Sequence, residues 1–233
     1  MKTKTNRPTN LIKSAWPLLL LLTAIVNAQI INIPDIYFKG RLINARPTNT
    51  VATDINGNYV KIDTNNDHEI QVSEAEAIYG LNISSVRFIE DLTGIENFVN
   101  IKSLDISSNM ISNIDLSPFQ NLISLSCGYN QFTGLDVNML PQLKSLSCRH
   151  NQITNMDISG LLNLTDLDCY ENQLTNLDLT GLPNLKSLIC QSNPLTSLNL
   201  TGLVYLEYLI CVATQLTGIN LNTQNNLIVM DCS

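Results

Sequence analysis

The sequence predicts a solenoid, a curved stack of 21-residue coils with a parallel β-sheet along one side. Three repeating features predict it. Cysteine recurs every 21 residues and nowhere else in the chain: Cys127, Cys148, Cys169, Cys190, Cys211 and Cys232. Apolar residues, mostly leucine, lie two and five residues before each cysteine. Asparagine lies three residues after each of the first four cysteines, and Thr214 takes its place after the fifth.

Each coil reads LxxLxCxxNxL, followed by a second apolar set such as Leu135, Val137 and Leu140. Alternating apolar residues favour a short strand that points every second side chain into the coil. A single coil buries too little apolar surface to offset the ordering of its backbone, so we expect the coils to fold only as a stack. The pattern resembles the leucine-rich repeat, LxxLxLxxNxL. The resemblance implies a leucine-rich repeat solenoid with its sheet on the concave face.

Two columns of the repeat carry polar chemistry. We expect the asparagines to pair with backbone groups that turn inward after each strand, and the turn at Thr214 to be looser, because one hydroxyl cannot replace an amide.

We expect all six cysteines to be buried free thiols. Parallel neighbours keep their Cβ atoms about 4.8 Å apart, whereas a disulfide needs about 3.8 Å. Disulfides are the alternative, and zinc is disfavoured because a line of thiols does not form a tetrahedron.

The chain divides into three segments. Residues 1–28 predict a signal peptide, because a basic leader precedes an apolar core of 12 residues and spanning a bilayer takes about 20. A membrane anchor is the alternative. Residues 29–99 predict an N-terminal cap with a leading coil, and residues 100–233 predict the repeat array, which we expect to be truncated at its C-terminus because no polar capping segment follows. We therefore expect a secreted or cell-surface protein, cleaved before Gln29, with no membrane insertion after cleavage.

The acidic balance of the chain restricts its partners. The chain has 13 Lys and Arg against 20 Asp and Glu, and the first 28 residues hold four of the basic residues and none of the acidic ones. The remainder therefore has a net charge of −11. Such a surface repels phosphate groups, which disfavours nucleic acid and anionic membranes as partners. Calcium and a protein or glycan ligand are the partners that we expect.

Within the cap, residues 63–74 read DTNNDHEIQVSE and resemble an EF-hand calcium loop. The oxygen donors at loop positions 1, 3, 5, 7, 9 and 12 are Asp63, Asn65, Asp67, the Glu69 carbonyl, Gln71 and Glu74. His68 replaces the usual glycine at a position that needs a left-handed backbone, so we expect weakened affinity. The alternative is a polar turn that caps a helix over residues 73–79, with Ser73 as its N-cap. Calcium is thus a candidate ligand that the fold does not require.

Nearly the whole mature chain resembles the secreted bacterial leucine-rich repeat proteins, similar in style to internalins, with an EF-hand-like N-terminal cap. The residues that carry the resemblance in the cap are Ile33, Pro34, Asp35, Phe38, Lys39 and Leu42 in an opening helix, the DxNxD loop, and Asp91, Leu92, Thr93, Gly94 and Ile95 where the array begins. The resemblance implies a role in adhesion or recognition. It also implies a separate C-terminal sorting domain, which this sequence does not contain.

The outward positions of the predicted strands indicate a ligand-binding surface on the concave face. These positions are small and polar in the early coils, aromatic and charged in the central coils, and β-branched in the late coils. Aromatic and charged side chains in one strip are typical of recognition surfaces. The candidate ligand-binding residues are Tyr129, Arg149, His150, Asp166, Asp168, Tyr170, Glu171 and Tyr208. The alternative is an idle face filled by strand-forming residues.

Enzyme activity is the rival class of function, and the sequence disfavours it. His68 and His150 are the only histidines, and neither a GxSxG nor an HExxH motif is present. Asp168 and Glu171 could pair as carboxylates, but carboxylates on an exposed strand are usually solvated. We therefore expect a binding module. A structural repeat protein of the cell envelope is one alternative, and a repeat domain attached to a missing enzyme or sorting domain is another.

Overall fold

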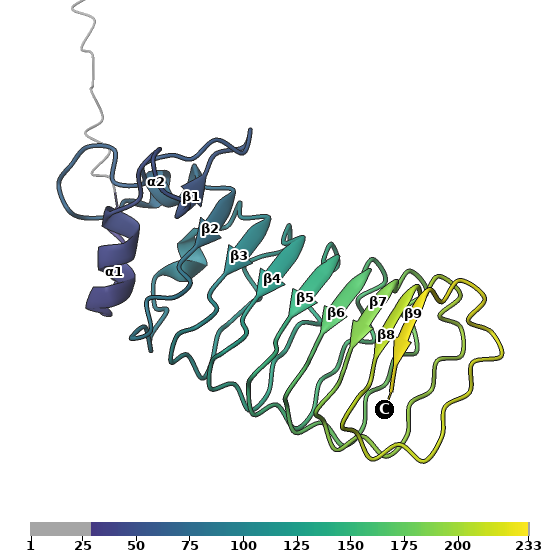
Figure 1. The fold of residues 1–233 in the computed structure, drawn as a ribbon. Helices are drawn as coiled ribbons and strands as arrows, with labels where there is room; N and C mark the ends of the chain where they lie inside the picture. The colour runs from purple at the N-terminus through teal and green to yellow at the C-terminus, as the bar shows by residue number, and fades with distance from the viewer. Residues whose placement is uncertain (1–28, 233) are drawn as a thin grey trace, which may run out of the picture.

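The computed structural model describes residues 29–232, so the predicted signal peptide lies outside the described residues. Nine strands of the described chain form one sheet in sequence order, side by side along the stack (Figure 1). They are β1 Ala52–Thr53, β2 Gly80–Asn82, β3 Ser103–Asp105, β4 Ser124–Ser126, β5 Ser145–Ser147, β6 Asp166–Asp168, β7 Ser187–Ile189, β8 Tyr208–Ile210 and β9 Val229–Asp231. β1 pairs with β2 in antiparallel orientation, and every later pair is parallel.

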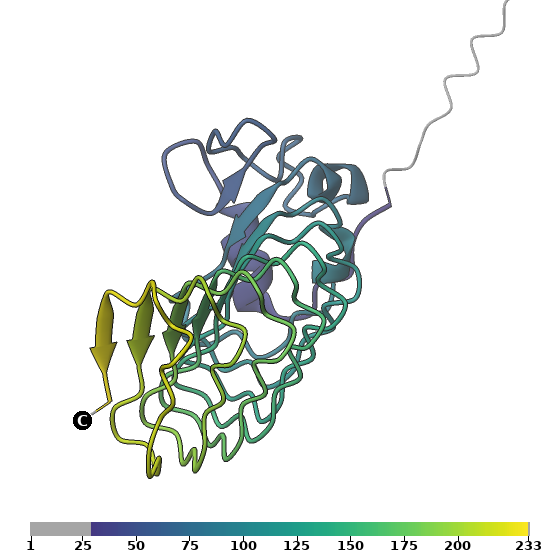
Figure 2. The same cartoon turned by 90° about the vertical axis from the view of Figure 1, so that its right-hand side faces the viewer.

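The strand register follows the period of the sequence. Leu104 lies opposite Leu125, and Leu125 lies opposite Leu146. These leucines are buried, while the residues on either side of them face outward. Strands lie on one side of the coils and irregular segments on the other (Figure 2). The predicted solenoid of 21-residue coils with a parallel sheet is therefore confirmed.

Two short helices and one 3-10 turn belong to the cap and its junction with the array: α1 Ile36–Ile43, α2 Val72–Glu76 and η1 Ile95–Asn97. The carboxylate of Asp35 caps α1, because its Oδ1 accepts from the N–H groups of Tyr37 and Phe38. Phe38 and Leu42 on the inner face of α1 are fully buried. In the described part of the chain, no helix has the length and apolar character needed to cross a bilayer.

Helix α2 differs from the helix that the sequence predicted over residues 73–79. Its N-cap is Gln71 and not Ser73, because the Glu74 carboxylate accepts from the Gln71 N–H at 3.1 Å and starts the helix earlier. The helix ends at Glu76, since the N–H of Tyr79 donates to the Thr53 carbonyl of β1 and so belongs to the sheet. The predicted N-cap at Ser73 and the predicted helix end at residue 79 are therefore wrong.

The asparagine column pairs with the backbone as predicted. The Asn130 Nδ2 donates to the carbonyls of Ile106 in the preceding coil and Cys127 in its own, at 3.0 and 3.1 Å. The Asn130 Oδ1 accepts from the Ile111 N–H at 3.0 Å. One side chain therefore satisfies groups in two coils. Thr214, at the equivalent position, donates from its hydroxyl to the Cys211 carbonyl at 2.9 Å.

The cysteine column is free in four places and paired at its end. Cys127, Cys148, Cys169 and Cys190 are buried free thiols, as predicted. The prediction is wrong for Cys211 and Cys232, which form a disulfide with their Cα atoms 4.5 Å apart. This separation is shorter than the spacing of about 4.8 Å that we assumed, and it lies within the range of disulfides.

Replacement of an asparagine in a central coil should destabilise the fold. Asn151 donates to the Cys127 and Cys148 carbonyls and accepts from the Phe132 N–H. Asn151→Ala leaves these groups unpaired, so we expect a loss of about 1–3 kcal/mol in the free energy of unfolding, measured by chemical denaturation. The exposed neighbour Gln152 is the matched control, and Gln152→Ala should change the stability little. Equal losses in both variants would contradict the assigned role of the asparagine.

The number of reactive thiols should be four. Alkylation of the unfolded, unreduced protein should modify four cysteines, and reduction beforehand should raise the count to six, as measured by mass spectrometry. In the folded protein these thiols should react slowly, because burial raises the pKa of Cys127 and Cys190 to about 12 and keeps both protonated. Six modified cysteines without reduction would show that Cys211 and Cys232 are not paired.

Candidate functional site

The turn after each strand repeats one backbone conformation. One residue of each turn has a left-handed backbone conformation, with φ of 56° at Tyr129, 52° at His150 and 53° at Glu171. Residues other than glycine adopt such φ values mainly where the surrounding structure fixes the backbone. The Tyr129 N–H donates to the Arg149 carbonyl at 2.8 Å, and the next turn repeats this bond with the Tyr170 carbonyl. Equivalent side chains of successive coils therefore lie one above another.

Three rings from three successive coils are in contact. The rings of Tyr129 and His150 stack with their centroids 4.0 Å apart and an angle of 19° between their planes. The His150 ring meets the edge of Tyr170, with centroids 4.7 Å apart and an angle of 74°. Both arrangements are favourable for aromatic pairs. His150 is the middle member, and it holds the two tyrosines in fixed positions.

Arg149 lies beside these rings and is held from two sides. Its guanidinium carbon is 5.4 Å from the centroid of the Tyr129 ring, and its Nη1 is 4.0 Å from Oδ2 of Asp168. The Arg149 stem covers Gly128, where an added Cβ would lie 3.0 Å from the Arg149 Cγ. Gly128 is buried beneath this stem. A larger residue at position 128 would displace the arginine.

Glu171 completes the group through two polar contacts. Its Oε2 lies 3.0 Å from Nδ1 of His150. It also accepts a hydrogen bond from the Tyr170 hydroxyl, and this bond, with the negative charge of Glu171, raises the pKa of Tyr170 above its ordinary value. The hydroxyl therefore stays a hydrogen-bond donor at neutral and mildly alkaline pH.

Six of the eight predicted ligand-binding residues come together in this way. We call them the strand-face cluster: Tyr129, Arg149, His150, Asp168, Tyr170 and Glu171. Asp166 lies on the same sheet but accepts from the Thr165 hydroxyl at 2.6 Å instead of contacting the cluster. Tyr208 lies two strands beyond Asp166 in the same column, opposite Ser187, and does not extend the cluster.

The carboxylates of the cluster have separate partners. Asp168 accepts from the Ser147 hydroxyl at 3.3 Å and from the Tyr170 N–H at 3.2 Å. Glu171 is occupied by His150 and Tyr170. Each carboxylate therefore stabilises the positions of its neighbours.

The structure also brings together the amide side chains of the predicted calcium loop. The Asn65 Nδ2 donates to Asp67 Oδ2 at 2.8 Å and to Gln71 Oε1 at 3.3 Å. The Gln71 Nε2 donates to the same Asp67 oxygen at 2.8 Å. On the other side of the loop, Glu74 Oε1 accepts from the N–H and hydroxyl of Thr64, both at 2.7 Å. Loop positions 3, 5 and 9 are therefore within hydrogen-bond reach of one another.

The remaining loop residues show what a metal would meet. His68 has the left-handed backbone that its position requires, with φ of 64°. The Glu69 carboxylate pairs with Lys39 of α1 at 2.6 Å. This carboxylate is therefore already occupied, and the loop pattern assigns only the backbone carbonyl of Glu69 as a metal ligand. Among residues 29–232 no three His, Cys, Asp or Glu side chains are grouped to hold a metal ion. A cation in this loop would therefore need the amide and carbonyl oxygens as well as the carboxylates.

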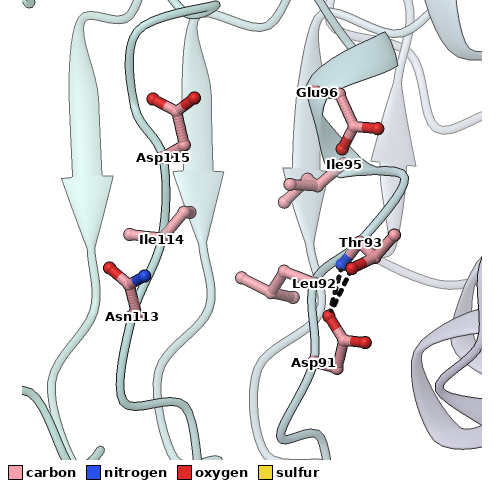
Figure 3. Close-up of a pocket in the computed structure, with 8 residues that line it drawn as sticks. All are labelled: Asp91, Leu92, Thr93, Ile95, Glu96, Asn113, Ile114 and Asp115. Atoms are coloured by element: carbon pink, nitrogen blue, oxygen red, sulfur yellow. Dashed lines mark hydrogen bonds between the residues drawn. The ribbon is translucent and has the colours of Figure 1, made fainter.

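Sequence reasoning missed one hollow on the side away from the strands. It has a volume of about 270 Å³ and lies between the start of the array and the next coil, as Figure 3 shows. Its lining includes the carboxylates of Asp91, Glu96 and Asp115. Asp91 is already occupied, since its Oδ1 accepts from the N–H and hydroxyl of Thr93. The hollow forms between residues of separate coils, so no local motif could have indicated it.

Comparison with known proteins finds no matching family model and no significantly similar curated sequence. Solved structures do match. The functional domain of InlJ from Listeria monocytogenes, which includes a cysteine ladder, matches with a TM-score of 0.52 and 26% identity over 88% of this chain and 52% of that one. Internalin C2 from the same species matches with a TM-score of 0.57 and 22% identity over 88% and 95% of the two chains. The chain has the leucine-rich repeat fold.

A third solved structure extends the comparison. TLR13 in its complex with ssRNA13 matches with a TM-score of 0.52 and 27% identity, over 66% of this chain and 25% of that one. This leucine-rich repeat chain spans about half of the InlJ domain, at 52% of its length. The repeat array shares its fold with these three solved structures.

Proposed function

We propose that this protein is a recognition module that binds a protein or glycan through the strand-face cluster. The observation that carries the proposal is the contact of three rings, one guanidinium and two carboxylates across three coils. Tyrosine and arginine are favoured in binding sites because they bury a large area at low entropic cost.

The internal contacts of the cluster favour binding. The side chains of Arg149 and Glu171 are 49% and 54% exposed, and Tyr129 is 45% exposed, so all three are open to a ligand. Each is nevertheless held by a neighbouring ring or charge. Side chains that are fixed before binding lose less conformational entropy when the ligand arrives. A uniform spacer surface would have no need of this arrangement, which argues against a purely structural role in the cell envelope.

Charge narrows the class of ligand. TLR13 is described in complex with RNA, but the part of this chain after residue 28 has a net charge of −11. The cluster itself contains two carboxylates beside one arginine. Phosphate backbones would be repelled by such a surface. Hydroxyl, amide and amine groups of a protein or glycan can instead pair with the carboxylates and the tyrosine hydroxyls.

We further propose that the protein is exported, as the N-terminal signal sequence indicates, and that it acts in adhesion or recognition outside the cell. Export would place the strand-face cluster in contact with external ligands. Mass spectrometry of the protein recovered from the medium or cell surface after expression in a bacterium should find Gln29 as the N-terminal residue. Retention of residues 1–28 in the exported protein would instead support a membrane anchor.

Loss of two cluster side chains should weaken binding. The wild-type protein can be screened against glycan panels and cell-surface proteins, and the affinity of each hit measured by biolayer interferometry. Arg149→Ala and Tyr170→Ala should each weaken binding at least about tenfold, because the first removes an exposed guanidinium and the second a half-buried ring of the cluster. Neither substitution opens a cavity in the core, so the melting temperature should change little.

Aspartates away from the strands provide the matched controls. Asp136 accepts only from the N–H of Asn138 in its own turn, and Asp157 occupies the equivalent place one coil later. Asp136→Ala and Asp157→Ala should leave the affinity unchanged. If these two variants lost affinity while Arg149→Ala and Tyr170→Ala retained it, the binding site would lie on the opposite side of the coils.

A further inference from the structure

Large apolar side chains are exposed together where the cap meets the array. Ile36 and Tyr37 of α1 are 74% and 46% exposed, and Phe88, in the segment before the array, is 57% exposed. The rings of Tyr37 and Phe88 are in contact, with their centroids 5.3 Å apart and an angle of 37° between their planes. Contiguous exposed apolar side chains of this kind are characteristic of interaction sites. All three residues line a hollow of about 410 Å³, which we call the cap hollow.

Asp35 fixes the two sides of the cap hollow relative to each other. Its Oδ1 caps α1, and its Oδ2 accepts from the N–H groups of Glu90 and Asp91 at 3.0 and 3.2 Å. One carboxylate therefore joins the helix that carries Tyr37 to the segment that follows Phe88. Burial alone would raise the pKa of Asp35, but the hydrogen bonds from these N–H groups together lower it below its ordinary value, so the carboxylate stays charged at neutral pH. The aromatic pair is thus held in place without a ligand.

The other two carboxylates of the cap hollow have oxygen atoms free to bind a ligand. Glu90 is exposed, and its carboxylate has no hydrogen-bond or ion-pair partner in the described chain. Asp91 binds Thr93 through Oδ1 only, which leaves its Oδ2 open. Among the described residues, neither a lysine nor an arginine lines the cap hollow. The two rings are therefore bordered by negative charge that nothing within the hollow neutralises.

The negative surface continues beyond the cap hollow onto the array. Asp91 also lines the hollow of about 270 Å³, whose other carboxylates are Glu96 and Asp115. Figure 3 shows Asp115 on the segment beside the one that carries Asp91 and Glu96. The two hollows thus adjoin at Asp91 and extend from α1 to the first coils of the array. A ligand that fills both contacts the cap and two coils, so an extended segment fits better than a small molecule.

From this combination of rings and carboxylates we infer that the cap hollow binds an arginine side chain from a basic segment of a partner protein. A guanidinium group stacks on aromatic rings and pairs with carboxylates through its N–H groups. Tyr37 and Phe88 would cover the plane and the apolar stem of the arginine, while Glu90 and Asp91 would pair with its charge. A second basic residue of the same segment would lie in the adjoining hollow.

Two further features fit a basic partner. The net charge of −11 after residue 28 attracts positively charged segments and speeds their association. The cap hollow also shares no residue with the strand-face cluster, so binding there does not depend on the ligand proposed above. A partner bound at the cap hollow would leave the strand-face cluster open.

Fluorescence anisotropy with labelled peptides and the whole protein tests the inference. One probe has two arginines among glycines, and the other has citrulline, which resembles arginine in shape but is uncharged, in both places. Wild-type protein should bind the arginine probe at least about tenfold more tightly than the citrulline probe, and added salt should weaken this binding. Phe88→Ala and Glu90→Gln should each weaken it about threefold, and the double variant about tenfold. Both side chains are exposed, so the melting temperature should change little.

Glu76 and Tyr59 give matched controls elsewhere in the cap. Glu76 is an exposed glutamate of α2 outside both hollows, and Tyr59 is 46% exposed. Glu76→Gln and Tyr59→Ala should leave the affinity for the arginine probe unchanged. Equal losses in Glu76→Gln and Glu90→Gln would show that the probe responds to net charge alone, which would overturn the inference. Failure of the wild type to bind the arginine probe, equal binding of the two probes, or full affinity in the double variant would overturn it as well.

Discussion

The buried asparagine side chains are the interaction on which the rest of the structure depends. Apolar stacking supplies most of the stabilisation but has no direction, so it cannot by itself fix how one coil sits on the next. The amide of Asn130 joins the backbone of two coils through four hydrogen bonds, and Asn172 and Asn193 repeat the pattern. Each unpaired backbone group in this interior would cost about 1–3 kcal/mol. The amides therefore favour one register between their coils, and the same register continues between β7 and β8, where Thr214 takes the place of the asparagine.

That register also determines the surface. Because each turn is closed in the same way, the residues that precede each asparagine adopt the same left-handed conformation in successive coils. Tyr129 and His150 consequently stack, although 21 residues separate them in sequence. The interior thus aligns the outer side chains without restricting which residues occupy those positions. A surface of this kind can concentrate rings and charges in a few coils, while the outer side chains of neighbouring coils stay small and polar.

The sequence predicted the features that repeat and missed those that occur once. The period identified the strands, the buried leucines and the asparagine pairing, because every coil meets the same neighbours. The disulfide of Cys211 with Cys232 was missed, since their Cα atoms lie 4.5 Å apart and the prediction assumed the average spacing of about 4.8 Å for every pair. The N-cap at Gln71 was missed because the competing Ser73 has the better intrinsic preference. Contacts of the strand-face cluster depend on side-chain rotamers, which a pattern of residue types does not encode.

The identical register of successive coils has a genetic consequence. Removal of one full period, such as the 21 residues 149–169, would join Cys148 to Tyr170 and leave every buried column continuous. Tyr129 would then neighbour Glu171 in place of His150, so the outer surface would change while the interior stayed the same. Unequal recombination between similar repeats produces such deletions and duplications in whole periods. Changes of whole periods would therefore alter the outer surface while keeping the buried columns in register.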